Sequence, residues 1–262
     1  MNCRDLEERV ATYAAGAPIP RDAARHLAEC ANCMRLLEAL QRAEAADIPS
    51  RDTMAQAVER IARDLRPVKP LAPAWMLAAG LLLAFGAVVA VGAGLLGPAG
   101  WRALDPAGRA LVFSVLAAGA GLLAIALGRV VAPGARLPAA PAIAVPGLLA
   151  AAGLVFVARF HAVAEPAFVA GGLVCLRIGL EAAALAAVLA AIVLRRGAVC
   201  DRAAAGALAG TFAGLAGLAV LETICPNHNL LHILAWHLGP AVLAASAGLL
   251  LGIAAGKRNN AG

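Results

Sequence analysis

Six apolar runs follow one another after residue 70, and each is close to the length that crosses a membrane as a helix. A helix needs about 20 predominantly apolar residues to span the hydrocarbon core. The third run is the least regular, because Pro141 and Pro146 lie in its first turns. The pattern predicts an all-α bundle of six transmembrane helices, near 74–97, 110–128, 140–159, 168–194, 203–224 and 230–255.

The first 46 residues have a different pattern, in which charged residues alternate with short apolar groups. Apolar positions at helical spacing predict two helices, over about 4–15 and 21–45. Glycine and proline at positions 16, 18 and 20 separate them, since these residues break helices. Residues 1–46 therefore form a small helical module ahead of the membrane domain, which we place at 71–262.

An amphipathic helix is predicted over 51–66, within a connecting segment at 47–70. Its large apolar residues recur at spacings of four, three and four, which places them on one stripe of the helix. The stripe could contact a protein partner, or it could lie on lipid headgroups beside the first span. Its members are Met54, Val58, Ile61 and Leu65.

The composition agrees with a membrane protein and with an orientation for it. Hydrophobic residues make up 62% of the chain and charged residues 15%, which is more apolar side chain than a soluble domain of this size can bury. Basic residues gather in the loops on the side of the N-terminus, so both termini are expected in the cytoplasm. The net charge of +6 is scattered rather than clustered, which argues against direct binding of nucleic acid. The first ten residues lack the apolar core of a cleavable signal.

A cluster of soft metal ligands lies in the N-terminal module. His26, Cys30 and Cys33 are spaced by four and three, so on one continuous helix their side chains would leave the same face. Cys3, on the preceding helix, is available as a fourth ligand. Because cytoplasmic cysteines are reduced, three thiols and one imidazole in this arrangement predict a Zn²⁺ site that staples a small core. The alternative is a set of reduced core cysteines with a surface histidine.

The same segment resembles the zinc-binding anti-sigma factor (ZAS) domain. The resemblance lies in the upstream Cys3, the sequence His26-Leu-Ala-Glu-Cys30-Ala-Asn-Cys33 and the Arg-Leu-Leu-Glu-Ala-Leu helix that follows. In that family the module and the next helix clamp a cytoplasmic sigma factor and hide its RNA-polymerase-binding surface. The resemblance implies a sigma factor as protein partner, with the 54–65 stripe in the contact.

The membrane half resembles NrsF-type negative regulators. The resemblance rests on Asp64-Leu-Arg-Pro-Val-Lys-Pro-Leu71, the six spans, and Cys225-Pro-Asn-His-Asn-Leu-Leu-His-Ile-Leu-Ala-Trp-His237. These six-span proteins of the bacterial inner membrane hold an extracytoplasmic-function (ECF) sigma factor until a stress signal arrives. They usually begin near the Leu-Arg-Pro-Val segment, so this chain is similar to a fusion of two anti-sigma designs. The zinc module, the helix 51–66 or both could therefore hold the sigma factor.

Two cysteines are implied as sensors by the NrsF resemblance, because Cys175 and Cys225 occupy the places of that family's paired thiols. The predicted topology also puts both at the outer ends of adjacent spans, where they could form a disulfide or bind a soft metal ion. Cys225, His228 and His232 are close enough in sequence to share a metal. The alternative is that these histidines, with His161 and His237 on the same side, bond to headgroups or backbone.

Two ionisable residues, Arg177 and Glu181, lie inside the fourth predicted span. Charges at that depth are costly and usually have a partner. Their spacing of four residues favours an ion pair within the helix, although Glu222 could also reach Arg177. A position just below Cys175 would allow the pair to couple thiol chemistry to helix packing.

Together these features predict a membrane-bound anti-sigma factor that releases its sigma factor on an envelope redox or heavy-metal signal. The partners expected are an ECF sigma factor and the lipid bilayer, with no small-molecule substrate. The alternative is a small transporter or channel with a regulatory zinc module, but the spans offer little polar pathway. We expect no enzyme activity, since the membrane half has no Cys-x-x-Cys and the chain has no recognisable catalytic motif.

Overall fold

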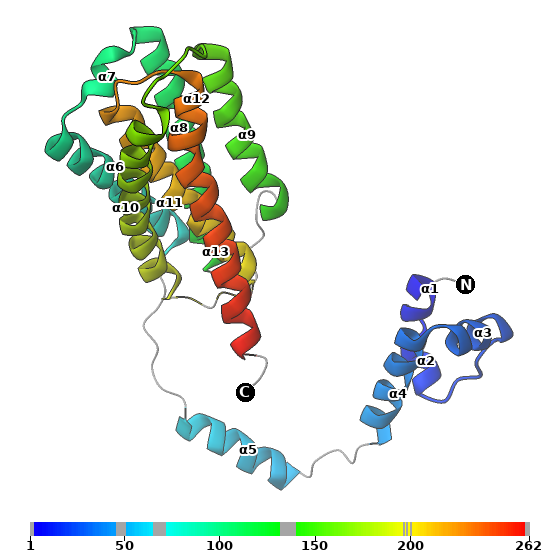
Figure 1. Cartoon of the computed structure of the whole chain (residues 1–262). Helices are drawn as coiled ribbons and strands as arrows, with labels where there is room; N and C mark the ends of the chain where they lie inside the picture. The colour runs from blue at the N-terminus through cyan, green and yellow to red at the C-terminus, as the bar shows by residue number, and fades with distance from the viewer. Residues whose placement is uncertain are drawn as a thin grey trace. The chain divides into compact units, whose positions relative to one another are not determined.

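The computed structural model describes residues 3–45, 51–64, 72–131, 140–195, 197, 199 and 201–259. All the regular structure in these residues is helical, which confirms the predicted all-α fold. The chain divides into two compact units, Met1–Lys69 and Pro70–Gly262 (Figure 1). Each unit is described by itself.

The N-terminal unit begins with four short helices around a small apolar core. They are α1 (Cys3–Glu7), α2 (Val10–Ala14), α3 (Arg21–Glu29) and α4 (Ala31–Ala45). Both helices expected from the sequence are thus interrupted, the first between α1 and α2 and the second at Cys30. Cys30 adopts an extended backbone conformation (φ −115°, ψ 100°), which ends α3 and lets α4 start in a new direction. The core contains Leu6, Val10, Tyr13, Ala23, Leu27, Cys33 and Leu37.

Helix α5 (Arg51–Asp64) occupies the predicted amphipathic segment. Three members of the apolar stripe, Met54, Val58 and Ile61, are exposed. The fourth, Leu65, lies outside the described residues. On the polar side, Arg63 forms an ion pair with Glu59 one turn away at 2.6 Å. An exposed pair of this kind contributes only about 0.3–0.5 kcal/mol to the stability of the helix. The apolar stripe is therefore the distinctive feature of α5.

In the part of the second unit that the structure describes, six helices are long and apolar enough to cross a membrane, which confirms the predicted number. Each agrees with its predicted range to within a few residues. The third begins at Pro141, where the missing N–H of proline costs nothing because the first turn has no acceptor for it. A short helix, α7 (Ala99–Ala103), lies between the first two. The six are α6 (Ala74–Leu96), α8 (Pro106–Val130), α9 (Pro141–Arg159), α10 (Phe168–Leu194), α11 (Arg202–Ile224) and the stretch Leu230–Lys257.

Helix α11 is the centre of this unit. Most of its residues are buried, and it contacts α6, α8, α9, α10 and α13 (Leu238–Asn259) (Figure 1). Glycines allow α13 to approach its backbone closely: a Cβ atom at Gly206 would lie 2.2 Å from the Gly248 carbonyl oxygen, and one at Gly210 2.2 Å from that of Ala244. Small residues at such spacing let membrane helices pack through backbone contact.

The sixth span is not a regular α-helix throughout. It starts as α12 (Leu230–His232), passes through a π-helical turn, η1 (Ile233–His237), and continues as α13 (Leu238–Asn259). π-Helical turns are rare, and within helices they occur frequently at functional sites. This turn lies next to the end of α11 that carries Cys225, which makes that end of the bundle a candidate functional site.

Candidate metal centres

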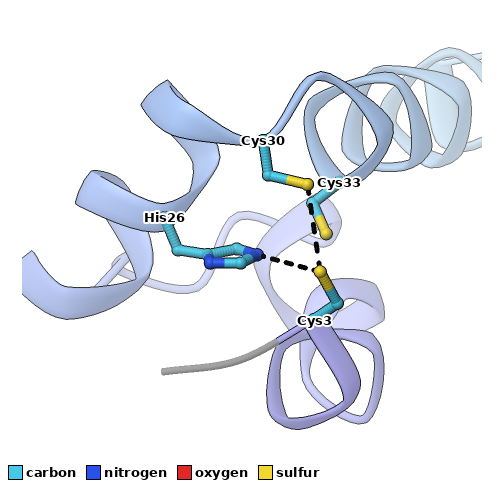
Figure 2. A group of neighbouring side chains, drawn as sticks. All are labelled: Cys3, His26, Cys30 and Cys33. Atoms are coloured by element: carbon cyan, nitrogen blue, oxygen red, sulfur yellow. Dashed lines mark hydrogen bonds between the residues drawn. The ribbon is translucent and has the colours of Figure 1, made fainter.

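Four side chains of the N-terminal unit converge at one point, as the sequence predicts (Figure 2). The Sγ atom of Cys3 lies 3.5 Å from His26 Nε2 and 3.9 Å from Cys30 Sγ. With Cys33, all four candidate ligand atoms lie within 4.8 Å of one another. Tetrahedral zinc with Zn–S of about 2.3 Å and Zn–N of about 2.0–2.1 Å would separate its ligand atoms by about 3.5–3.8 Å. The observed distances fit that arrangement.

The four ligands come from separate elements rather than from one helix face. Cys3 begins α1, His26 is in the last turn of α3, and Cys33 is in the first turn of α4 (Figure 2). The expectation that His26, Cys30 and Cys33 share one continuous helix is therefore wrong, because the chain breaks at Cys30. The break brings the Cys30 thiol alongside Cys3, so the Cys-x-x-Cys segment acts as a turn that opens a helix.

The thiols of this cluster differ in acidity. The backbone N–H of Cys33 lowers the pKa of the Cys30 thiol, whereas burial raises the pKa of the Cys33 thiol to about 12. Metal ligation requires the thiolate form. A divalent cation at the centre would supply the positive charge that lets the buried Cys33 ionise beside Cys30. The three sulfur donors and one nitrogen are the set that suits a structural Zn²⁺.

A second cluster lies at one end of the membrane unit and contains both predicted sensing cysteines. Cys175, in the second turn of α10, has its Sγ 3.7 Å from that of Cys225, which ends α11. His232 Nε2 is 3.8 Å from Cys225 Sγ. With His237, these candidate ligand atoms lie within 4.8 Å of one another.

Two carboxylates hold the histidines of this second cluster. Glu165 Oε1 is 3.0 Å from His232 Nδ1, and Glu222 Oε1 is 2.8 Å from His237 Nδ1. His237 and Glu222 are completely buried, and His232 nearly so. Within the described residues, the imidazole Nε2 of His237 has no nitrogen or oxygen atom as hydrogen-bond partner, and the side chain interacts with the Cys225 thiol. Glu222 therefore pairs with His237 rather than reaching toward Arg177, as the sequence had allowed.

The remaining candidates lie elsewhere. His228, which the sequence allowed as a ligand beside Cys225, instead stacks on the Phe160 ring with centroids 5.3 Å apart. Arg177 and Glu181 form an ion pair along α10 at 3.3 Å, and both side chains are largely exposed on the surface of the unit. They are thus outside the thiol cluster.

Sequence reasoning did not identify Glu165, Glu222 and His237 as parts of this cluster. Residues five apart, such as His232 and His237, point in different directions on an α-helix, so their spacing gave no signal. The π-helical turn brings them onto one side, with ring centroids 5.2 Å apart. Glu165 is in a loop, and its proximity to His232 follows only from the tertiary structure.

Comparison with known families gives a clear result for the membrane unit. A family model described as "Negative regulator of sigma F" (NrsF) matches residues 61–255. The chain belongs to the NrsF family. No curated protein and no solved structure matches it. The NrsF match begins within the last turns of α5, so the Cys/His module before it rests on its own motif and geometry.

Proposed function

We propose that this NrsF protein is a bacterial inner-membrane anti-sigma factor that holds an ECF sigma factor at the cytoplasmic face. The observation that carries the proposal is the family match over the membrane unit, since the family is one of negative regulators of a sigma factor. The N-terminal unit supplies the parts that a soluble partner would meet: a compact four-helix module with a metal-type cluster, and an amphipathic helix. The excess of basic residues in alternate loops supports a cytoplasmic location for this unit and for both termini.

Helix α5 is the segment we expect to contact the sigma factor directly. Met54, Val58 and Ile61 are 55%, 63% and 62% exposed, which leaves an apolar stripe in water. Burying such a side chain fully stabilises a complex by about 1.5–3 kcal/mol. Burial of the three together would supply several kcal/mol, and recognition of an amphipathic helix in a groove uses such a stripe. The Zn²⁺ module precedes α5 in the chain and would offer the sigma factor a second contact surface.

The stress signal is proposed to act at Cys175 and Cys225. Their thiols lie together at one end of the bundle, one on α10 and the other at the end of the central α11. Oxidation to a disulfide or binding of a heavy-metal ion would change how α10 and the end of α11 pack. Such a change can bias a two-state equilibrium, and only to the extent that the signal favours one state energetically. The released state would free the sigma factor.

The test is co-purification of the tagged full chain from membranes with individually expressed ECF sigma factors of the same organism. We expect one sigma factor to be retained, and Val58→Asp to weaken its binding by about 10- to 100-fold, because a carboxylate replaces a buried apolar side chain. The matched control is Gln56→Asp, which adds the same charge to the polar side of α5. Retention of no sigma factor by the intact chain would overturn the proposal, and equal loss in both variants would remove the stripe from it.

A second arm of the same experiment adds an oxidant or cadmium to the purified complex. The wild-type complex is expected to dissociate. Replacement of Cys175 and Cys225 by serine should preserve binding and abolish release, because the signal then has no thiols to act on. Release that continues unaltered in this variant would show that the sensor lies elsewhere.

A further inference from the structure

We infer that Cys175, Cys225, His232 and His237 form a four-ligand centre for a d¹⁰ cation such as Cd²⁺ or Zn²⁺. The inference deepens the proposed sensing role of the two cysteines and rests on it for its regulatory meaning. The metal site itself rests on the geometry alone. Two thiol sulfurs and two imidazole nitrogens within 4.8 Å of one another match the donor set of tetrahedral sites.

The orientation of the two imidazoles is the strongest support. Glu165 and Glu222 each lie within hydrogen-bond distance of an Nδ1 atom, at 3.0 and 2.8 Å. When each carboxylate accepts from Nδ1–H, the Nε2 lone pair is left free as a ligand. Histidines that bind metals almost always donate their other nitrogen in this way, to a carboxylate, backbone carbonyl or water, which fixes the ring and raises its basicity. The two rings are thus oriented with Nε2 toward the thiols before any ion arrives.

The His237 Nε2 atom supplies an independent observation. It is buried and, within the described residues, has no hydrogen-bond partner besides the Cys225 thiol. A buried nitrogen that meets only a weakly bonding sulfur is poorly satisfied, and native proteins rarely retain such an atom without a reason. A cation at the centre of the cluster would satisfy this nitrogen. The π-helical turn that brings His237 beside His232 has the same explanation, because an α-helical turn would point the two rings apart.

The charge of the two thiols and the distance between them suit a metal ion bound by both Cys175 and Cys225 better than a disulfide between them. Two thiolates neutralise a divalent cation, which removes the cost of burying either charge alone. The sulfurs are 3.7 Å apart, whereas a disulfide requires about 2.05 Å, so the thiols lie at ligand spacing. Binding of M²⁺ releases one proton from each thiol and oxidises nothing. A disulfide would consume both sulfur ligands, so the two states exclude each other.

The experiment measures Cd²⁺ binding to the full chain under reducing conditions, in a Cys30→Ser/Cys33→Ser background that removes the N-terminal cluster. One Cd²⁺ per chain is expected. His237→Ala should weaken binding at least 100-fold, and Glu222→Gln, which keeps every ligand, by about 10- to 100-fold. The control is His228→Ala, which alters a nearby histidine outside the cluster and should bind normally.

X-ray absorption of the Cd²⁺-loaded background protein adds a measurement that needs no variant of the centre, and two sulfur and two nitrogen neighbours are expected. No binding, a shell of sulfur without nitrogen, or unchanged affinity in His237→Ala would overturn the four-ligand centre. None of these readouts involves a sigma factor. A failure of the proposed function would appear in the sigma-retention assay instead, and the two failures are therefore distinguishable.

A different observation, the exposed ion pair on α10, carries a second inference. Arg177 is about 13 Å along α10 from Phe168 at 1.5 Å per residue, so the pair lies deep within a hydrocarbon layer of about 30 Å. The side chains of Arg177 and Glu181 are nevertheless 76% and 65% exposed on the surface of the unit. A charged group at the centre of a bilayer is energetically costly, and such residues usually face protein or water.

We propose that this face of α10 packs against a second copy of the chain. Exposed residues recur along it at spacings of four and three, which is the seam of a left-handed helix pair. Two copies with the same topology pack in parallel around a two-fold axis, so Arg177 lies one turn from Glu181 of the partner subunit and the reverse, and each copy supplies a counter-charge to the other. Small and branched residues flank the charges and allow close approach. The seam is Ala170, Val174, Arg177, Glu181, Ala184 and Val188.

The test is the mass of the full chain in lipid nanodiscs, where a dimer is expected. Arg177→Glu and Glu181→Arg should each give monomers, because like charges would then face each other, and the double exchange should restore the dimer. Should a charge variant fail to fold, crosslinking through Ala184→Cys provides a second test. The control is Leu122→Cys, at an exposed position of α8. A monomeric wild type, an unrestored double exchange, or equal crosslinking at both positions would overturn the interface.

Discussion

Replacement of Cys30 and Cys33 by serine is expected to unfold residues 3–45 while the six-helix unit stays folded. The core of the four-helix module consists of only seven buried residues, one of them Cys33 itself. Modules of this size rarely supply enough hydrophobic stabilisation alone. A structural Zn²⁺ contributes apparent binding free energy of about 10–16 kcal/mol, which is larger than the whole stability of a typical small domain. Loss of two ligands should therefore remove the fold of the module.

Hydrogen exchange resolved by segment measures this outcome. Amides of α1 to α4 should lose their protection, and amides of the buried α11 should keep theirs. The control is Glu29→Ser, one residue before Cys30, where the side chain is exposed and contributes no ligand. Full protection of α3 and α4 in the double cysteine variant would show that the module folds without metal. The four side chains would then be a structural cluster and no zinc site.

The sequence was sufficient to predict the six spans because their signal is set by the bilayer. A run of about 20 apolar residues has few alternatives to a membrane helix, and proline at the start of α9 does not disturb it. The N-terminal ligands were equally accessible, since metal ligands must be close in space and three of them are close in sequence. The NrsF resemblance implied the pair Cys175 and Cys225, and the predicted topology agreed by placing both at the same end of adjacent spans.

The parts that the sequence did not reveal depend on backbone irregularities and on tertiary contacts. The break at Cys30 has no proline or glycine to announce it. The π-helical turn changes which residues lie on the same face of the sixth span. The sequence, which was interpreted with α-helical spacing, therefore did not predict that His237 lies beside His232. Hydropathy alone did not distinguish the central helix either, since all six spans are strongly apolar. Glycines at spacing four occur in α11 and also in α13, and they act through the contacts between the two helices.

The second large effect is expected at Gly210, where α11 and α13 touch through their backbones. A Cβ atom there would lie 2.2 Å from the Ala244 carbonyl oxygen, and backbone cannot move aside as the end of a side chain can. Overpacking of a core typically costs about 1–3 kcal/mol. Gly210→Leu should exceed that range, because the whole side chain must enter a helix contact that has no space. Thermal unfolding of the full chain in detergent, followed by helix content, measures the loss.

The matched control is Gly121→Leu on α8, where a Cβ atom would meet nothing within 4 Å. Leucine also favours a helix over glycine by up to about 1 kcal/mol, so this variant should be neutral or slightly more stable. The comparison bears on the sensing end as well, because α11 ends at Cys225 and α13 follows directly on His237. The glycine contact that holds the two helices together therefore also sets the spacing of these two ligands. Equal stability of the two leucine variants would mean that α11 and α13 are not packed through Gly210. The spacing of Cys225 and His237 would then not be set by this contact.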